Sequence, residues 1–406
     1  MNPSLSFSLL EDHRHDGERS GEGSAVSLKD GRLLLIYSAF RGGGGSDHSP
    51  GQLVVRRSAD GGASWTEPVP VFALPEGALN LMSASLLRLR DGRIGCVYSV
   101  KWTQGSHCVP YWTTSHDEGE SWAEPRPITT AREYFVVNND RLIELRDGTL
   151  VLPYARHGNL DSDGDDTALF RKALNARCGI FYSRDGGESW TRPDTARRFE
   201  PEWFTLPSPF RPEKAHPEAL RVIQERYDVF QEPGVVERSD GRLMMWARSL
   251  SHVYASRLCD LDGAWEDFRA LPGLNVCCGP QTIKRLPGSD RLVMLYNDRG
   301  EMGYGEPGYP LRTPLSVAVS DDDGESWQAL APLEGDESKN YCYFSLLFFG
   351  DRFLATYYES VPRLEADGTP SLDVNGHEKR RNLASLKVCR GGCDLFRVSP
   401  SPAKAS

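Results

Sequence analysis

The chain contains 406 residues, carries a formal net charge of −10 and is 39% hydrophobic. Because no basic block or stripe accompanies this acidic balance, the composition excludes nucleic acid as an expected partner. The length alone suggests two or three domains, but short motifs recur from end to end and predict a single domain, residues 1–406.

Met1 to Asp16 contains no apolar run long enough for a signal peptide, and no later stretch is long enough to span a bilayer. We therefore expect a cytoplasmic protein without a membrane partner. The nine cysteines stand at irregular spacings, including the adjacent Cys277 and Cys278, and form neither a disulfide framework nor a Cys-x-x-Cys metal pattern. Reduced thiols, no metal and no organic cofactor are the resulting expectations.

The first repeated pattern is Ser-x-Asp-x-Gly-x-x-Trp, in which an aspartate lies close to glycine backbone and a tryptophan closes the segment. Such a segment predicts a turn held by bonds from side chain to backbone. The copies start at Ser58, Ser115, Ser183 and Ser320, and a degenerate fifth copy spans residues 256–265. Several copies of one turn indicate a structural repeat.

The second repeated pattern is an Asp-Gly turn followed by an apolar strand. Asp-Gly between apolar runs predicts a hairpin, because glycine accepts the positive φ that these turns require. The turns lie at Asp30, Asp91, Asp147 and Asp240, with looser versions at 289–290 and 350–351. The pattern therefore predicts six hairpins.

The two patterns alternate along the chain and predict a repeated four-stranded antiparallel unit. Six such units that close in a ring predict an all-β fold, a six-bladed β-propeller of four-stranded blades with only short edges. Helical periodicity is nearly absent; the candidate helix, Pro217 to Tyr227, lies in an insertion of about residues 195–228. Residues from about 397 to 406 are expected to form a frayed tail.

Polar side chains stand at equivalent places before and after the Asp-Gly turns. Residues about equally far from a turn lie at the same end of a hairpin, so we expect these side chains to ring one central channel. Before the turns stand Glu22, Ser83, Asn139, Glu232 and Tyr343, with Gln281 or Thr282 in the fifth unit, and after them Arg41, Lys101, Arg156 and Arg248, with Arg312 later in the fifth unit. Carboxylates, a tyrosine and several guanidiniums suit an anionic, hydroxylated ligand. The alternative is that strand ends are polar because they contact water.

These motifs resemble the sialidase (neuraminidase) superfamily, over nearly the whole chain. The Ser-x-Asp-x-Gly-x-x-Trp repeat resembles the Asp-box of these six-bladed propellers. Phe40 to Gly51 resembles the first-blade segment whose loop aspartate is the acid and base, which implies that Asp47 protonates the leaving oxygen and then activates water. A loop aspartate beside a glycine run is the alternative reading of Asp47.

Two further segments resemble parts of the family's site. Glu232 to Arg248 is similar to the segment with the catalytic glutamate and a carboxylate-binding arginine, which implies that Glu232 is the base for a tyrosine nucleophile and that Arg248 clamps the substrate. Arg312 occupies the place of another clamp arginine. Strand-end polarity, a salt bridge and a surface charge are the respective alternatives.

The segment from Tyr341 to Ser345 resembles the one that carries the nucleophile. We choose Tyr343 as that nucleophile, although Tyr341 has the same parity and packing of a buried tyrosine is the alternative. A tyrosine suits a sugar whose anomeric carbon bears a carboxylate, because an attacking Asp or Glu would meet like charge.

One segment departs from the family. Sialidases carry Arg-Ile-Pro on the first strand to complete a clamp of three arginines, whereas residues 19–24 here read Arg-Ser-Gly-Glu-Gly-Ser, so that Glu22 stands about where a guanidinium is expected. This carboxylate would repel an acidic sugar unless it pairs with Arg41 or another arginine. Arg19 is the candidate that reaches in as a substitute.

The resemblance implies a retaining exo-glycosidase that hydrolyses terminal sialic acid or a related acidic sugar from glycoconjugates, with a small-molecule glycan as substrate. A glycosidase for a different sugar and a glycan-binding propeller without catalysis are the alternatives. The expected catalytic residues are Asp47, Glu232 and Tyr343, and the expected substrate-binding residues are Arg41, Arg248, Arg312, Glu22, Asn139 and Arg156. The sequence predicts no oligomeric state.

Overall fold

The computed structural model describes residues 5–14, 16–42, 45–157, 176–193, 231–249, 252–277, 279–300, 312–361, 365, 367, 369 and 384–397. Over these ranges the fold is all-β, and the helix they contain is the short 3-10 helix η2 (Cys393–Phe396). No helix within them has the length and apolar character needed to cross a membrane. The expected insertion near 195–228, with its candidate helix, and the tail from 398 onward lie outside the described residues.

The first half of the chain forms antiparallel strands that pair mainly with their neighbours in sequence. Single parallel pairings, Gly51 with Asn80 and Cys108 with Tyr134, connect successive groups, so that twelve strands share one sheet. The strands are β2 (Arg19–Ser27), β3 (Leu33–Phe40), β4 (Gly51–Ser58), β5 (Val69–Pro70), β6 (Asn80–Arg88), β7 (Ile94–Lys101), β8 (Cys108–Ser115), β9 (Arg126–Pro127), β10 (Tyr134–Val136), β11 (Ile143–Glu144), β12 (Leu150–His157) and β13 (Arg177–Ser183).

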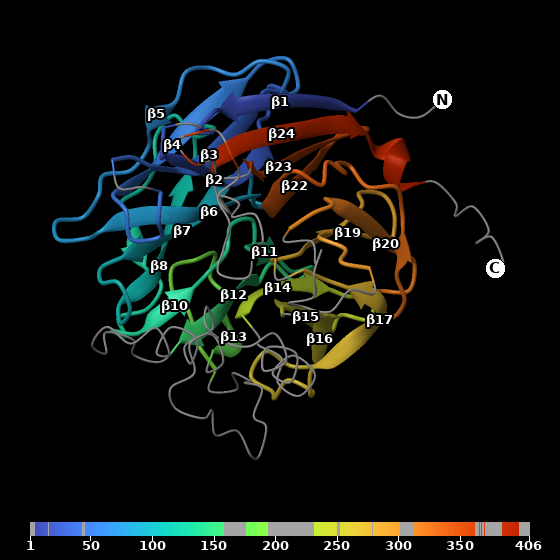
Figure 1. Ribbon diagram of the computed structural model, residues 1–406. Helices are drawn as coiled ribbons and strands as arrows, with labels where there is room; N and C mark the ends of the chain where they lie inside the picture. The colour runs from blue at the N-terminus through green and yellow to red at the C-terminus, as the bar shows by residue number, and fades with distance from the viewer. Residues whose placement is uncertain are drawn as a thin grey trace, which may run out of the picture.

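The second half forms three sheets of four strands. Two follow sequence order, β14 (Gln231–Glu237) to β15 (Leu243–Arg248), β16 (His252–Leu258) and β17 (Arg269–Asn275), and β18 (Thr282–Arg285) to β19 (Leu292–Tyr296), β20 (Ser316–Ser320) and β21 (Gln328–Ala329). The last joins β22 (Asn340–Phe349), β23 (Arg352–Ser360) and β24 (Ser385–Gly392) to the N-terminal strand β1 (Ser6–Glu11). The sheets follow one another around a common centre, and the pairing of β1 with β24 brings the two ends of the fold together (Figure 1).

Each hairpin turn predicted from the sequence joins two antiparallel strands. The pairs are β2–β3, β6–β7, β11–β12, β14–β15, β18–β19 and β22–β23. In the first turn Gly31 has a φ of 86°, and a carboxylate oxygen of Asp30 accepts a bond from the backbone N–H of Arg32 over 3.0 Å. The six predicted hairpins are therefore confirmed.

The Ser-x-Asp turns close through their own side chains. Ser58 Oγ donates to Asp60 Oδ1 over 2.9 Å and accepts from the backbone N–H of Gly62 over 2.8 Å. The Asp60 carboxylate also accepts from the N–H of Ser64, and Trp65 Nε1 donates to the Gly62 carbonyl over 3.1 Å. The same bond from serine to aspartate recurs at Ser115, Ser183 and Ser320. Each turn is thus closed by bonds within its own segment.

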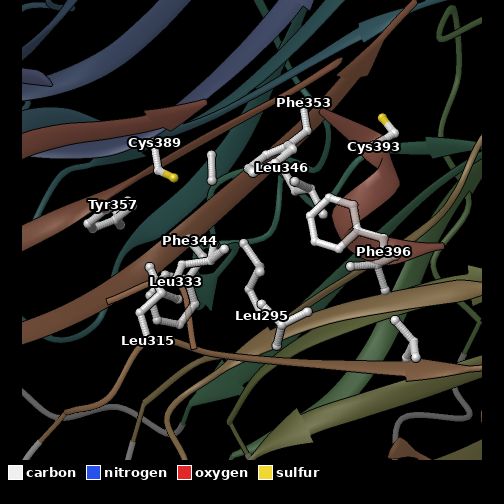
Figure 2. Packing of buried hydrophobic residues seen from close by; sticks show 14 of the residues in the cluster. Leu295, Leu315, Leu333, Phe344, Leu346, Phe353, Tyr357, Cys389, Cys393 and Phe396 are labelled. Carbon is white, nitrogen blue, oxygen red and sulfur yellow. The ribbon is translucent and has the colours of Figure 1, made fainter. Parts of the chain in front are cut away.

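Apolar side chains fill the space between neighbouring sheets. Figure 2 shows one cluster, in which Leu295 of β19 and Leu346 of β22 pack with residues of β23, β24 and η2. The ring centroids of Phe353 and Phe396 lie 4.8 Å apart, and both side chains are fully buried. Burial of one such side chain contributes about 1.5–3 kcal/mol. Packing between sheets therefore holds the frame that carries the polar residues at the centre.

Four strands share an irregularity near their first residues. The pairing register shifts between Gly21 and Ser24 in β2, and at equivalent places in β6, β14 and β22. The residues with positive φ in these shifts are Glu22 (51°), Ser83 (59°), Glu232 (49°) and Tyr343 (56°). A bulge of this kind aims one side chain in a new direction, and a positive φ outside glycine costs about 1–3 kcal/mol. The same strained conformation at the equivalent position of four strands marks a candidate functional site.

Candidate active site

The four bulged side chains line one cavity of about 420 Å³. Asp47, Lys101, Arg248 and Arg312 contribute to the same wall. The volume lies in the range of pockets that enclose small ligands. Residues from β2, β6, β7, β14, β15 and β22 thus meet at the centre of the fold, and the three side chains expected to be catalytic are among them.

Tyr343, Glu232 and Arg248 form a chain of contacts inside the cavity. Tyr343 Oη donates to Glu232 Oε1 over 2.8 Å, and Arg248 Nη1 donates to Glu232 Oε2 over 2.5 Å. The Glu232 and Arg248 side chains are buried. The carboxylate therefore has one oxygen for the phenol and the other for the guanidinium, and the expected closeness of Glu232 to Tyr343 is confirmed.

The charges of this chain of contacts place the proton on the phenol. Burial alone would raise the pKa of Glu232, but Arg248, the hydrogen bond from Tyr343 and the charge of Arg312 together lower it. Burial and the negative charge of Glu232 raise the pKa of Tyr343 well above its ordinary value. An ionised carboxylate that faces a neutral phenol is the arrangement of a base and its proton donor.

Arg312 approaches Tyr343 from the segment before β20. Its guanidinium carbon lies 5.8 Å from the centroid of the Tyr343 ring, and Nη1 lies 3.3 Å from Cys342 Sγ. Its backbone N–H donates to Asn340 Oδ1 over 3.0 Å, and its carbonyl accepts from Asn297 Nδ2 over 3.0 Å. Arg248 and Arg312 therefore both line the cavity, as expected, and both lie beside the tyrosine and glutamate.

Asp47 reaches the cavity from the loop between β3 and β4. Its side chain is 55% exposed, and its carboxylate forms an ion pair with Arg19 Nη1. Although enclosure by the site opposes ionisation, the charge and hydrogen bond of Arg19 lower the pKa of Asp47 to about 2. Arg19 therefore favours the ionised form of Asp47.

Glu22 lies on the opposite side of the same guanidinium. Its side chain is 2% exposed, pairs with Arg19 Nη2 and accepts a bond from Ser83 Oγ over 2.6 Å. Burial raises the pKa of Glu22, as do the charges of Asp47 and Glu232, while Arg19 opposes them. The carboxylate expected at this place is thus present and is compensated by another arginine.

Arg41 is not the partner of Glu22, and it is not among the described residues that line this cavity. Its guanidinium lies 3.0 Å from Glu18 and 3.6 Å from Glu11, outside the set of side chains that line the cavity. Arg156 likewise pairs with Glu133 over 2.7 Å and is absent from the lining. Alternate side chains of a strand point to opposite faces, and both arginines stand an odd number of residues after their turns. Lys101 and Arg248 stand at even offsets and do line the cavity.

Asn139 does not line the cavity either. Its Nδ2 donates to the carbonyls of Gly23 over 2.8 Å and Tyr343 over 3.4 Å, so it connects the backbones of neighbouring strands. The positive φ in this segment falls one residue later, at Asp140 (59°), and Asn138 takes the place in the lining. This shift by one residue exchanges the side chain that reaches the cavity.

The fifth unit contributes neither of its two candidates. The carbonyl of Gln281 accepts from Arg141 Nη2 over 2.6 Å, and Thr282 Oγ1 accepts from Arg141 Nη1 over 3.0 Å. Both residues are buried and lie outside the cavity lining. They hold neighbouring strands together rather than face the centre.

Several residues of the site had no motif to identify them. Arg19, which pairs with both Asp47 and Glu22, precedes the bulge by a few residues, and only the three-dimensional path brings it beneath them. Lys101 and His157 line the cavity from β7 and β12. Lys101 is among the side chains expected to ring the channel, and His157 stands at the same offset of ten residues after its turn aspartate, so a count of even offsets from the turns would have found His157 as well.

Comparison with known proteins agrees with this arrangement. The model of the BNR repeat-like domain family matches residues 98–354. A sialidase of Bacteroides fragilis is 26% identical over 371 residues, which cover 82% of this chain and 59% of the relative. The chain therefore spans about three fifths of the length of that relative.

Solved structures with low sequence identity share the fold. A protein of unknown function from Dyadobacter fermentans has a TM-score of 0.61 at 16% identity, with 95% of this chain and 99% of that chain covered. A Hadza microbial sialidase has a TM-score of 0.64 at 17% identity (93% and 66% covered), and the sialidase of Trypanosoma rangeli one of 0.63 at 14% identity (98% and 61% covered). The family model, the relative and the fold agree, and the chain belongs to the BNR-repeat family of the sialidase superfamily.

Proposed function

We propose that this protein is a retaining exo-glycosidase that releases a terminal sialic acid or a related acidic sugar from a glycoconjugate. The observation that supports it most is the chain of contacts from Tyr343 to Glu232 to Arg248, in a cavity that also contains Asp47. Relatives named as sialidases support the same reaction class.

In the first step the phenolic oxygen of Tyr343 attacks the anomeric carbon while Glu232 takes the phenolic proton. Asp47 gives its proton to the glycosidic oxygen, the bond from the anomeric carbon to that oxygen breaks, and the sugar stays attached to Tyr343. In the second step Asp47 takes a proton from water, whose oxygen attacks the anomeric carbon. The phenol leaves and recovers its proton from Glu232.

A tyrosine nucleophile fits a substrate that carries a carboxylate on the reacting carbon. A neutral phenol avoids the repulsion that an attacking carboxylate would meet. Arg248 and Arg312 supply the positive charge that such a substrate requires, because guanidiniums bind carboxylates through paired hydrogen bonds. A bound carboxylate would add negative charge beside Asp47, which raises the pKa of that carboxyl and favours protonation of the acid.

The order of the sheets also supports a more detailed description of the fold. We infer that its sheets form six blades, namely β2–β5, β6–β9, β10–β13, β14–β17, β18–β21 and β22–β24 with β1. In this interpretation residues 1–406 form one domain. The bulged residues would then be the inner ends of the blades, which accounts for their convergence on one cavity.

One observation favours a second candidate, a glycosidase of the same mechanism that acts on a different sugar. Glu22 presents a carboxylate to the cavity, and the Arg19 guanidinium beneath it already contacts Glu22, Asp47 and Tyr358. Among the described residues of the cavity lining, the guanidiniums left to face a substrate carboxylate are those of Arg248 and Arg312. A sugar with a hydroxyl or amino group toward Glu22 would suit this wall.

The test is hydrolysis of a panel of aryl glycosides that differ in the sugar, acidic and neutral, by the wild-type protein and by Tyr343→Phe. The proposal expects release of the aryl alcohol from at least one acidic sugar and a fall in kcat/KM by at least about 10³ in the variant. Activity that survives the substitution unchanged would eliminate Tyr343 as the nucleophile.

A further inference from the structure

The loop that carries Asp47 is held by polar side chains from three strands. Arg19 of β2 pairs with the Asp47 carboxylate and contacts the Gly45 carbonyl over 3.4 Å. Asn80 of β6 donates from Nδ2 to the carbonyls of Asp47 over 3.1 Å and Ser49 over 3.0 Å. Lys101 of β7 donates from Nζ to the Asp47 carbonyl over 3.0 Å. The loop backbone and the acid side chain are thus both fixed.

All three anchoring side chains are buried. The exposed fractions are 1% for Arg19, 0% for Asn80 and 2% for Lys101. A buried cation or amide costs several kcal/mol unless it is paired, so side chains without a use would not be expected at these positions. The strands themselves do not require them, because most hydrogen bonds of these three side chains go to the Asp47 loop.

The Arg19 guanidinium is held in one orientation by its neighbours. Its guanidinium carbon lies 4.3 Å from the centroid of the Phe40 ring and 5.3 Å from that of Tyr358. Nε donates to Tyr358 Oη over 2.7 Å, while Nη1 and Nη2 pair with Asp47 and Glu22. A planar fork with each nitrogen engaged keeps one orientation. The Arg19 guanidinium therefore gives the Asp47 carboxylate a fixed support.

We propose that Arg19, Asn80 and Lys101 are positioning residues that hold Asp47 in line with the leaving oxygen of the substrate. Asp47 lies on a half-exposed loop, whereas proton transfer requires a donor within hydrogen-bond reach of that oxygen. The three side chains come from buried strands, and they fix the position of Asp47 more precisely than an exposed loop could alone. This inference rests on the proposed function, since it assigns the proton donor to Asp47.

The test compares two leaving groups on the same sugar. An alkyl or sugar alcohol needs a proton to depart, whereas 4-nitrophenol departs readily without one. Loss of either cation also removes a charge that lowers the pKa of Asp47, but we expect the loss of position to dominate. Arg19→Met and Lys101→Met should therefore lower kcat/KM for the alkyl glycoside by about 100-fold and for the 4-nitrophenyl glycoside by less than about 10-fold, since an acid contributes about 10²–10⁴. Asn80→Leu should act in the same direction with a smaller effect. Asp47→Asn removes the acid itself, so it sets the largest difference between the two substrates in the loss of kcat/KM.

Arg56→Met is the matched control for loss of a buried arginine. Arg56 pairs with Glu11 over 2.7 Å and contacts Tyr37, outside the cavity lining. A purely structural effect should lower kcat/KM for both substrates by the same factor, and Arg56→Met is expected to do so. Equal losses for both leaving groups in Arg19→Met and Lys101→Met would overturn the proposal.

A second measurement separates this inference from the proposed function. Crystal structures of Arg19→Met and Asn80→Leu should show the Asp47 carboxylate displaced from its place in the cavity, whether or not a substrate is hydrolysed. A carboxylate that stays in place in both variants would overturn the anchoring role. Failure of the wild-type protein to hydrolyse any glycoside would count against the proposed reaction, whereas displacement of Asp47 would still support the anchor.

Discussion

The hydroxyl of Tyr343 lies 2.8 Å from a carboxylate oxygen of Glu232, although 111 residues separate the two in the sequence. Both residues have a positive φ at the bulge of their strand. Two strained residues from different sheets that meet through a hydrogen bond are better explained by a shared task than by packing.

Substitution of Glu232 by glutamine removes the base and keeps the size of the side chain. We expect kcat/KM to fall by about 10²–10⁴, the usual contribution of a general base. The buried Arg248 loses its ionic partner, and the free energy of unfolding should fall by about 3–5 kcal/mol. Steady-state kinetics and urea unfolding measure the two effects.

Glu237→Gln is the control, because Glu237 stands on the same strand, β14, and accepts a bond from the backbone of Arg146 outside the cavity. Its kcat/KM should equal that of the wild type. A Glu232→Gln variant as active as Glu237→Gln would contradict the role of the base.

The pH dependence of activity follows from the lowered pKa of Glu232. An ordinary glutamate has a pKa of 4.5, and Glu232 should stay ionised below it, so the acid limb of kcat/KM should have its midpoint below pH 4.5. The same shift means that Glu232 stabilises the fold above its unfolded pKa and that this contribution is lost as the pH falls through the lowered folded value. Activity profiles and thermal unfolding between pH 3 and pH 7 measure both effects. An acid limb above pH 4.5 that persists in Glu22→Gln would disagree with this account.

Glu22 should influence which sugars the site accepts. Glu22→Gln keeps hydrogen-bonding groups for Arg19 and Ser83 but removes a negative charge from the wall. We expect the ratio of kcat/KM for acidic over neutral aryl glycosides to rise about tenfold, equal to about 1.4 kcal/mol. Ser83→Ala, which removes a bond to Glu22 without a change of charge, should alter the ratio less. An unchanged ratio in Glu22→Gln would show that Glu22 does not face the part of the sugar that bears charge.

Packing between the sheets should dominate stability. Phe396→Ala removes a fully buried ring that contacts Phe353, and the free energy of unfolding should fall by about 3–5 kcal/mol. Phe7→Ala serves as the control, because the Phe7 side chain is 41% exposed and its loss should cost less than about 0.5–1 kcal/mol. Denaturant unfolding compares the variants. Similar losses of unfolding free energy in both variants would show that packing between the sheets does not dominate stability.

The hairpins and half of the site could be predicted because they depend on local spacing. Glu232 and Tyr343 both stand eight residues before their turns, and a hairpin of constant length carries such residues to the same level. In the third hairpin the positive φ falls at Asp140, seven residues before Asp147, and Asn138 rather than Asn139 lines the cavity.

Arg41 and Arg156 lie outside the cavity lining for a different reason. The prediction of Arg41 and Arg156 rests on their distance from the turn alone. Both stand at odd offsets, where side chains point away from the cavity. Arg19 was considered only as a substitute clamp, because its contacts with Asp47 and Glu22 depend on a loop and a bulge that meet only in three dimensions. Spacing along one strand therefore identifies the groups that face the centre, but not the buried groups that hold them.

The central claim is that Tyr343 bears the sugar during the reaction. The most direct test is to trap the intermediate with a fluorinated sugar-acid analogue that carries a good leaving group, digest the protein with trypsin and locate the added mass by fragmentation. The account predicts the label on Tyr343, within the peptide from Asn340 to Arg352. A label on Tyr341, Cys342 or any other residue would contradict it.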